Sequence, residues 1–131
     1  MRIKYTSLYV NDQGKALKFY TEILGFVRKA DITAGKYRWL TVVSPEDPDG
    51  TQLILEPNEN PVAKAYQEAL FKQGIRATMF LVDDIQKEYE RLKKLGVKFT
   101  MEPTELPGTG STIAVLDDTC GNLVQITKLQ F

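Results

Sequence analysis

The residues with the clearest capacity for chemistry lie near the end of the chain, in the run DDTCGNLVQI at positions 117–126. This run holds two adjacent carboxylates, the only cysteine and a Gly-Asn pair that precedes an apolar stretch. Such residues can bind a metal ion, supply a thiolate nucleophile or close a turn. The chain of 131 residues contains no histidine, which excludes His-based triads, a histidine general base and imidazole metal ligands.

The cysteine of this run, Cys120, is predicted to be an inert turn residue. A thiol becomes nucleophilic where its surroundings favour the thiolate, whereas Asp117 and Asp118 would repel a negative charge at this position. One cysteine cannot supply a four-thiolate zinc or iron–sulfur site, and it cannot form a disulfide within the chain. The absence of a disulfide framework fits a reducing compartment, and we expect a cytoplasmic protein.

Two loops match ion-binding or phosphate-binding motifs only in part. Asp49-Gly50 followed by Glu56 matches the end of a calcium loop, but the first ligand position falls on Pro45 and strands flank the loop. The run PGTGST (107–112) lacks the Gly-Lys-Ser/Thr ending of a phosphate loop and leads into a strand. We therefore interpret both as turns.

Polar residues on apolar strands are the better candidates. Strand alternation places Gln52, Ile54 and Glu56 on one face of the run TQLILE, and Tyr5 and Ser7 on one face of the first strand. A glutamate in so apolar a strand lies either at an edge that faces water or in a cavity with a partner. The spacing leaves both alternatives open.

The elements that position these residues come from an internal duplication. The stretches 9–26 and 81–99 each contain a strand, a polar N-cap, an amphipathic helix and a glycine stop. Val10 and Val82 are 72 residues apart, as are Lys15 and Lys87. We predict two strand–helix–three-strand units, with strands that include 37–43, 51–56, 97–102, 111–116 and 122–129 and loops at 44–50 and 103–110. We predict one domain over 1–131, in which module one (about 1–57) and module two (about 75–131) are joined by a linker helix (about 58–74).

The overall composition excludes several classes of partner. Seventeen basic residues balance seventeen acidic ones, so no net field attracts nucleic acid or an anionic membrane. The longest apolar runs are too short to span a bilayer, and the N-terminus has no apolar core typical of a signal peptide.

The sequence is similar to the vicinal oxygen chelate superfamily, which includes glyoxalase I, bleomycin-resistance proteins and extradiol dioxygenases. The resemblance rests on SLYVNDQGKALKFYTEILGF (7–26), the module repeat, and the closing Asp-x-x-Gly-Asn pattern in DDTCGNLVQI. It implies an α+β fold of two βαβββ modules, in which eight strands form a curved mixed sheet around a cavity. It also implies a homodimer.

Metal-using members of that superfamily carry ligands on four strands. The resemblance places these positions at Tyr5, Glu56, Ala77 and Gln125 of this chain, where one carboxylate remains among neutral residues. Such a set binds a divalent ion poorly, because charged or imidazole ligands must offset the ion's dehydration. We therefore expect no metal and no cofactor.

The resemblance predicts a ligand-binding cavity with a polar floor and aromatic and apolar walls. In this hypothesis the Tyr5 hydroxyl and the Gln125 amide donate hydrogen bonds to Glu56. The predicted ligand-binding residues are Tyr5, Ser7, Trp39, Glu56, Met79 and Gln125.

Three functions remain open. The leading hypothesis is metal-independent binding or sequestration of a small molecule, as in resistance proteins, although the zero net charge argues against cationic bleomycin itself. One alternative is a metal-independent enzyme with Glu56 as general base. Another is a metal-dependent glyoxalase-like lyase or dioxygenase-like oxidoreductase with non-standard ligands.

Overall fold

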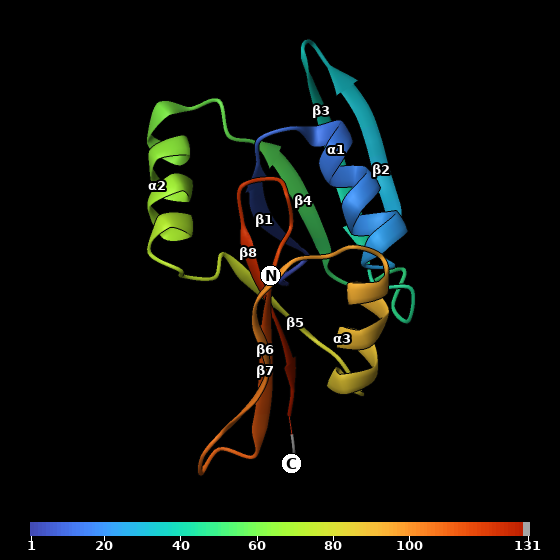
Figure 1. Cartoon of the computed structure of the whole chain (residues 1–131). Helices are drawn as coiled ribbons and strands as arrows, with labels where there is room; N and C mark the ends of the chain where they lie inside the picture. Colours follow the sequence, from blue (N-terminus) through green and yellow to red (C-terminus); the bar gives the residue numbers. More distant parts are fainter. Residues whose placement is uncertain (130–131) are drawn as a thin grey trace. The chain divides into compact units, whose positions relative to one another are not determined.

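The computed structural model describes residues 1–129 and has an α+β fold built from two βαβββ modules (Figure 1). The chain divides into two compact units, Met1–Glu68 (unit 1) and Ala69–Phe131 (unit 2). The boundary falls within helix α2 (Pro61–Lys72), so the predicted linker helix contributes to both units.

Unit 1 is a four-stranded sheet covered on one face by a helix. Its strands follow the order β1-β4-β3-β2, and β1 runs parallel to β4 whereas the other neighbours are antiparallel. Its elements are β1 (Tyr5–Val10), α1 (Gln13–Lys18), the π-helical turn η1 (Phe19–Ile23), β2 (Val27–Ala34), β3 (Tyr37–Val43) and β4 (Gln52–Pro57).

Local chemistry explains where the first helix begins and ends. The Asp12 carboxylate accepts a hydrogen bond of 2.9 Å from the Lys15 amide, which satisfies one of the unpaired N–H groups at the start of α1. Gly25 follows η1 with φ of 90°, a left-handed conformation that glycine adopts without steric cost.

The core of unit 1 lies between α1, η1 and the sheet, and Figure 1 shows α1 across one face of the strands. Because strand side chains alternate, every second residue faces the helix and is buried there. The buried apolar residues of this layer are Leu8, Val10, Ala16, Phe19, Tyr20, Leu40, Val42, Leu53 and Leu55.

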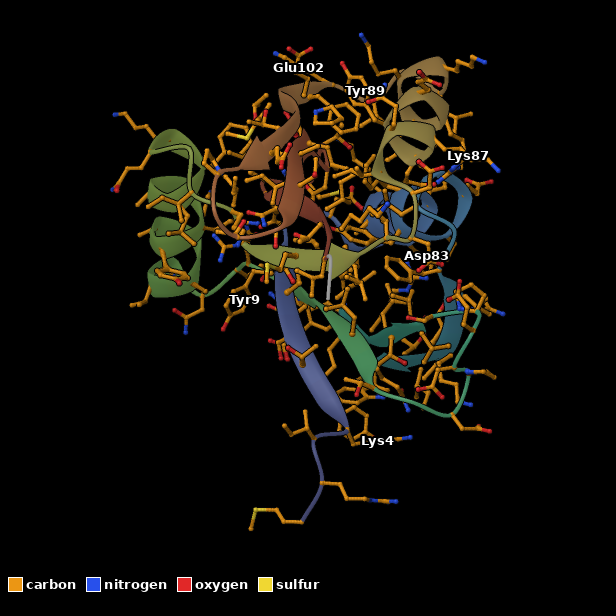
Figure 2. All side chains as sticks on the ribbon, turned by 90° about the horizontal axis from the view of Figure 1, so that it is seen from below. Lys4, Tyr9, Asp83, Lys87, Tyr89 and Glu102 are labelled. Carbon is orange, nitrogen blue, oxygen red and sulfur yellow. The ribbon has the colours of Figure 1, made fainter. Side chains whose placement is uncertain are left out.

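Unit 2 repeats this plan, with the order β5-β8-β7-β6 and β5 parallel to β8. The Asp84 carboxylate accepts from the Lys87 amide at 3.1 Å, and Gly96 follows the helix with φ of 88°. Lys87 projects outward from the helix while Tyr89 lies on its sheet side (Figure 2), where its ring packs edge-to-face on Phe99. The elements are β5 (Thr78–Leu81), α3 (Ile85–Lys94), β6 (Phe99–Leu106), β7 (Ser111–Asp117) and β8 (Leu123–Lys128).

The predicted fold class is confirmed, with two departures in detail. The run 103–110 was expected to be a loop, but β6 continues to Leu106. Pro103 is tolerated because β6 is the edge strand and its pairing with β7 shifts register between Met101 and Thr104, which leaves Pro103 out of the hydrogen-bonded ladder. The second departure is β2, an edge strand rich in charged and exposed residues whose span the sequence pattern did not single out. Among residues 1–129, no helix is both long and apolar enough to cross a membrane.

Candidate functional site

The face of the unit 1 sheet opposite α1 gathers four of the predicted ligand-binding residues. In the β1–β4 register Ser7 pairs with Ile54 and Tyr9 with Glu56, and Thr41 of β3 also pairs with Ile54. Residues that pair across strands share a face, so alternation fixes the rest of this face. We call this face the distal face of unit 1. Tyr37, Val43, Ala30 and Ala34 also lie on it, and the residues used in the argument are Tyr5, Ser7, Tyr9, Ile32, Trp39, Thr41, Gln52, Ile54 and Glu56.

Two half-exposed aromatic rings meet on the distal face. The ring centroids of Tyr5 and Trp39 are 5.7 Å apart at an interplanar angle of 69°, which is an edge-to-face contact. The Tyr5 side chain is 52% exposed and Trp39 is 39% exposed, in contrast to the fully buried layer beneath α1. Both rings therefore present apolar area together with a polar O–H or N–H group.

A buried polar pair lies beside these rings. The Thr41 hydroxyl donates to the Gln52 side-chain carbonyl at 2.8 Å, and both residues are buried. Tyr5 is directly opposite Gln52 in the β1–β4 register. The sequence placed Gln52 on this face by alternation, but nothing in it indicated that Thr41 would fix the Gln52 amide.

Glu56 lies at the other end of the distal face from Tyr5. The register pairs Glu56 with Tyr9 and Tyr5 with Gln52, so the two predicted partners are separated by four residues along the strands, about 13 Å. The predicted hydrogen bond from Tyr5 to Glu56 stays a prediction. No described residue donates a hydrogen bond to the Glu56 carboxylate or forms an ion pair with it.

In unit 2 the two remaining predicted residues, Met79 and Gln125, lie side by side. They pair in the β5–β8 register, and the Gln125 amide nitrogen is 3.7 Å from the Met79 sulfur. The same nitrogen donates to the Thr127 hydroxyl at 2.9 Å. The amide of Gln125 is thus engaged within its own unit, and its predicted bond to Glu56 stays a prediction.

The run 117–126 contains the turn from β7 into β8, and its residues from Leu123 onward belong to β8. The Asp118 carboxylate is buried and accepts from the Cys120 amide at 2.7 Å, from the Asn122 amide at 3.0 Å and from the Asn122 side chain at 2.8 Å. Thr119 at the turn has φ of 62°, and Cys120 is buried. Asp118 therefore shapes the turn from inside the structure and is not a solvated acid.

Charge pairing in unit 1 lies away from the distal face. The Arg38 guanidinium donates to both Asp31 carboxylate oxygens, at 3.0 and 2.7 Å, and these hydrogen bonds hold the pKa of Asp31 below its ordinary value. The Arg38 amide donates to the Gln13 side-chain oxygen, and Gln13 belongs to α1. Arg38 thus points to the face opposite Trp39, as strand alternation requires.

The strand registers relate the site residues of one unit to those of the other. Ser7 and Met79, which are 72 residues apart, pair with Ile54 and Gln125 respectively. The unit 1 counterpart of Gln125 is therefore Ile54, and Glu56 lies two residues beyond it. This repeat relation leaves the four ligand positions that the resemblance implies, Tyr5, Glu56, Ala77 and Gln125, as a prediction.

The residues present do not fit the metal ion that the superfamily uses. Within residues 1–129, no group of three or more acidic, cysteine or histidine side chains lies close enough together to hold one. The four positions implied by the resemblance carry a tyrosine, a glutamate, an alanine and a glutamine, so one carboxylate alone would have to offset the dehydration of the ion. No step of a reaction can be routed through such an ion here.

Comparison with known proteins agrees with this architecture. Residues 2–126 match a family model described as the Glyoxalase/Bleomycin resistance protein/Dioxygenase superfamily. The chain belongs to this superfamily. It is 60% identical over 128 residues to the uncharacterised protein YurT of Bacillus subtilis (strain 168), covering 98% of this chain and 99% of YurT.

The relatives include a probable enzyme, a solved structure without a functional description and an antibiotic binding protein. A probable lactoylglutathione lyase of Arabidopsis thaliana is 30% identical over 92% of this chain, which spans 33% of that protein. Among solved structures, UcmS2 is 32% identical with a TM-score of 0.81 and 97% coverage of both chains. TnmS3, an antibiotic binding protein from Streptomyces sp. CB03234, is 25% identical with a TM-score of 0.74, covering 99% of this chain and 97% of its own.

Proposed function

We propose that this protein binds an apolar, aromatic small molecule without a metal ion and thereby sequesters it, as a resistance-type member of the superfamily. The observation that carries the proposal is the Tyr5–Trp39 pair, whose half-exposed rings stand beside the buried Thr41–Gln52 hydrogen bond. Small-molecule sites have this composition, with apolar and aromatic walls and a few fixed polar groups. The likeness to an antibiotic binding protein supports the same proposal.

The proposal includes three further expectations. The ligand-binding set contains Tyr5, Ser7, Trp39, Glu56, Met79 and Gln125, the protein acts as a homodimer, and it acts in the cytoplasm. The homodimer and the cytoplasmic location follow from the superfamily resemblance and from the cysteine usage. Light scattering at several protein concentrations tests the homodimer, and a monomer at micromolar concentration would contradict it.

A thermal-shift screen of a library of aromatic metabolites and antibiotics tests the binding function, run beside elemental analysis of protein purified without chelator. A ligand that binds only the folded state raises the melting temperature. At one hundred times its Kd, it adds about 2.7 kcal/mol to the free energy of unfolding. We expect hits that lose their shift in Trp39→Ala and keep it in Tyr66→Ala, which removes an exposed aromatic ring on α2 instead. A stoichiometric metal ion in the purified protein would contradict the proposal, and so would ligands whose thermal shift is unchanged in Trp39→Ala.

The second candidate function is that of a metal-independent enzyme, which would use the Glu56 carboxylate as a general base. Glu56 pairs with Tyr9 in the β1–β4 register, and with no described donor its carboxylate is available to accept a proton. Proton abstraction beside a carbonyl also needs a group that stabilises the oxyanion, and the cationic side chain of Arg38 on β3 points to the opposite face. Full turnover by Glu56→Gln on any substrate found in the screen would refute this candidate.

A further inference from the structure

The distal face of unit 1 carries a buried polar pair at positions where unit 2 is apolar. The pair consists of Thr41 on β3 and Gln52 on β4, joined by a hydrogen bond. The strand registers make Val115 the counterpart of Thr41 in unit 2, and Leu123 the counterpart of Gln52. Both counterparts are buried as well. The fold therefore accepts an apolar pair at these positions, and packing of the sheet does not require the polar one.

The hydrogen bond satisfies only half of the Gln52 amide. A glutamine side chain has an oxygen that accepts and a nitrogen that carries two N–H donors. The Thr41 hydroxyl donates to the oxygen at 2.8 Å, which directs the nitrogen away from Thr41. Among residues 1–129, none accepts a hydrogen bond from this nitrogen, and no buried side-chain nitrogen or oxygen lacks a partner. The N–H donors of a residue that is only 8% exposed therefore reach the surface.

These donors lie beside aromatic surface. Tyr5 is directly opposite Gln52 in the β1–β4 register, and neighbouring strands are about 4.8 Å apart. The Tyr5 ring forms the edge-to-face contact with Trp39. A ligand ring that packs on Tyr5 thus brings a substituent within reach of the Gln52 amide. A site with oriented donors rejects an analogue that lacks the acceptor, because the donors would then be desolvated without a partner.

We propose that Gln52 determines the specificity of the ligand site by donating a hydrogen bond to a carbonyl oxygen conjugated to the aromatic ring of the ligand. Thr41 is the positioning residue that orients the Gln52 amide. An uncharged carbonyl suits a neutral amide donor, whereas a carboxylate or phosphate is best matched by a cation, and none of the distal-face residues named above is cationic. This inference rests on the proposed function and names the ligand class.

Two probes of the same shape test the proposal: 2-acetylnaphthalene and 2-isopropenylnaphthalene, in which a C=CH2 group replaces the C=O group. We expect the ketone to bind about fivefold more tightly in calorimetry, which is the order of one neutral hydrogen bond to an oriented donor. In proton–nitrogen correlation spectra, the side-chain amide protons of Gln52 should move further downfield with the ketone than with the alkene. A purely structural role of Gln52 would not produce this difference.

Substitutions that introduce the unit 2 residues assign the preference. In Gln52→Leu the two probes should bind with equal affinity, and the protein should stay folded because Leu123 fills the equivalent position of unit 2. Thr41→Val should weaken the preference by releasing the amide, and Thr41→Ser should keep it. Because Thr41→Val acts through a second residue, the test holds even if Gln52→Leu is less stable. The matched control is Gln86→Leu, an exposed position on α3, which should behave as the wild-type protein does.

Each other outcome contradicts a named claim. If the alkene binds the wild-type protein as tightly as the ketone, carbonyl recognition is refuted while the proposed binding of aromatic molecules stands. If the preference survives in Gln52→Leu, the carbonyl is recognised elsewhere and the assignment to Gln52 is wrong. If it is unchanged in Thr41→Val, Thr41 does not position the amide. If neither probe binds, the ligand class is overturned, and the thermal-shift screen decides the proposed function separately.

Discussion

The two units share a topology and a register but differ in the residues that face away from their helices. On the helix side the repeat is close: Asp12 and Asp84 cap the helices in the same way. On the other side, the Tyr9–Glu56 pair of unit 1 corresponds to Leu81 and Thr127 in unit 2. Helix packing constrains one face of each sheet to the same apolar pattern, whereas the opposite face tolerates different chemistry. The residues that carry the function are therefore expected on the sheet faces that point away from the helices, where the two units differ.

The largest effect separates the two faces of unit 1. Leu55 is fully buried against α1, whereas Ile32 on the distal face is 60% exposed. We expect Leu55→Ala to lower the free energy of unfolding by about 3 kcal/mol, because it leaves a cavity in a packed layer, and Ile32→Ala to change it by less than about 1 kcal/mol. Urea unfolding followed by circular dichroism measures both. Equal losses of unfolding free energy in the two variants would show that the distal face is also part of the core, and would contradict the difference between the two faces.

The next effect separates the turn of unit 2 from the corresponding loop of unit 1. Asp118 is buried with three hydrogen bonds in the β7–β8 turn, whereas the side chain of Asp49, between β3 and β4, is 94% exposed. Asp118→Ala should cost about 2 kcal/mol, because buried donors lose their acceptor, and Asp49→Ala should cost less than about 0.5 kcal/mol. If Asp49→Ala lowers the free energy of unfolding as much as Asp118→Ala does, the two side chains stabilise their turns equally and the expected difference is wrong.

A smaller effect tests whether the helix starts are equivalent. Asp12→Ala and Asp84→Ala each remove one side-chain acceptor for the amide three residues later. Each should lower the free energy of unfolding by about 1 kcal/mol, and the serine variants should recover most of that loss because a hydroxyl also caps a helix. Amide hydrogen exchange would localise each loss to α1 or α3. Exchange that rises equally in both helices after one substitution would contradict independent capping.

Local signals in the sequence predicted the helices, caps and most strands because those depend on residues a few positions apart. Gly25 and Gly96 end their helices as expected, and the span of β3 matches its apolar run. The position of Glu56 relative to Tyr5 could not be predicted, because alternation fixes the face of a residue but not its partner on another strand. Register depends on how strands distant in the sequence align.

The same limit explains the details that departed from expectation. Pro103 predicts a loop by its own chemistry, and its place in β6 follows only from the edge position and register shift of that strand. The buried state of Asp118 depends on amides that turn back toward it, which no composition signal in DDTCGNLVQI reveals. The candidate site was therefore predictable as a set of residue types on a face, and its pairings were not.

The smallest expected effect concerns pH and again distinguishes the units. Hydrogen bonds from Arg38 lower the pKa of Asp31 from its ordinary value of 3.8, and this bidentate pair joins β2 to β3 in unit 1. A carboxyl whose folded pKa is depressed contributes stability that is present above its unfolded pKa and is lost as the pH falls through the folded pKa. Unit 1 should therefore lose a small amount of stability below about pH 4, and Asp31→Asn should remove that part of the pH dependence. Hydrogen exchange of β2 and β3 amides between pH 3 and 6, corrected for intrinsic rates, measures it. An unchanged pH profile in Asp31→Asn would show that solvent screens this exposed pair completely, and that the pairing of the edge strand β2 depends on its backbone ladder alone.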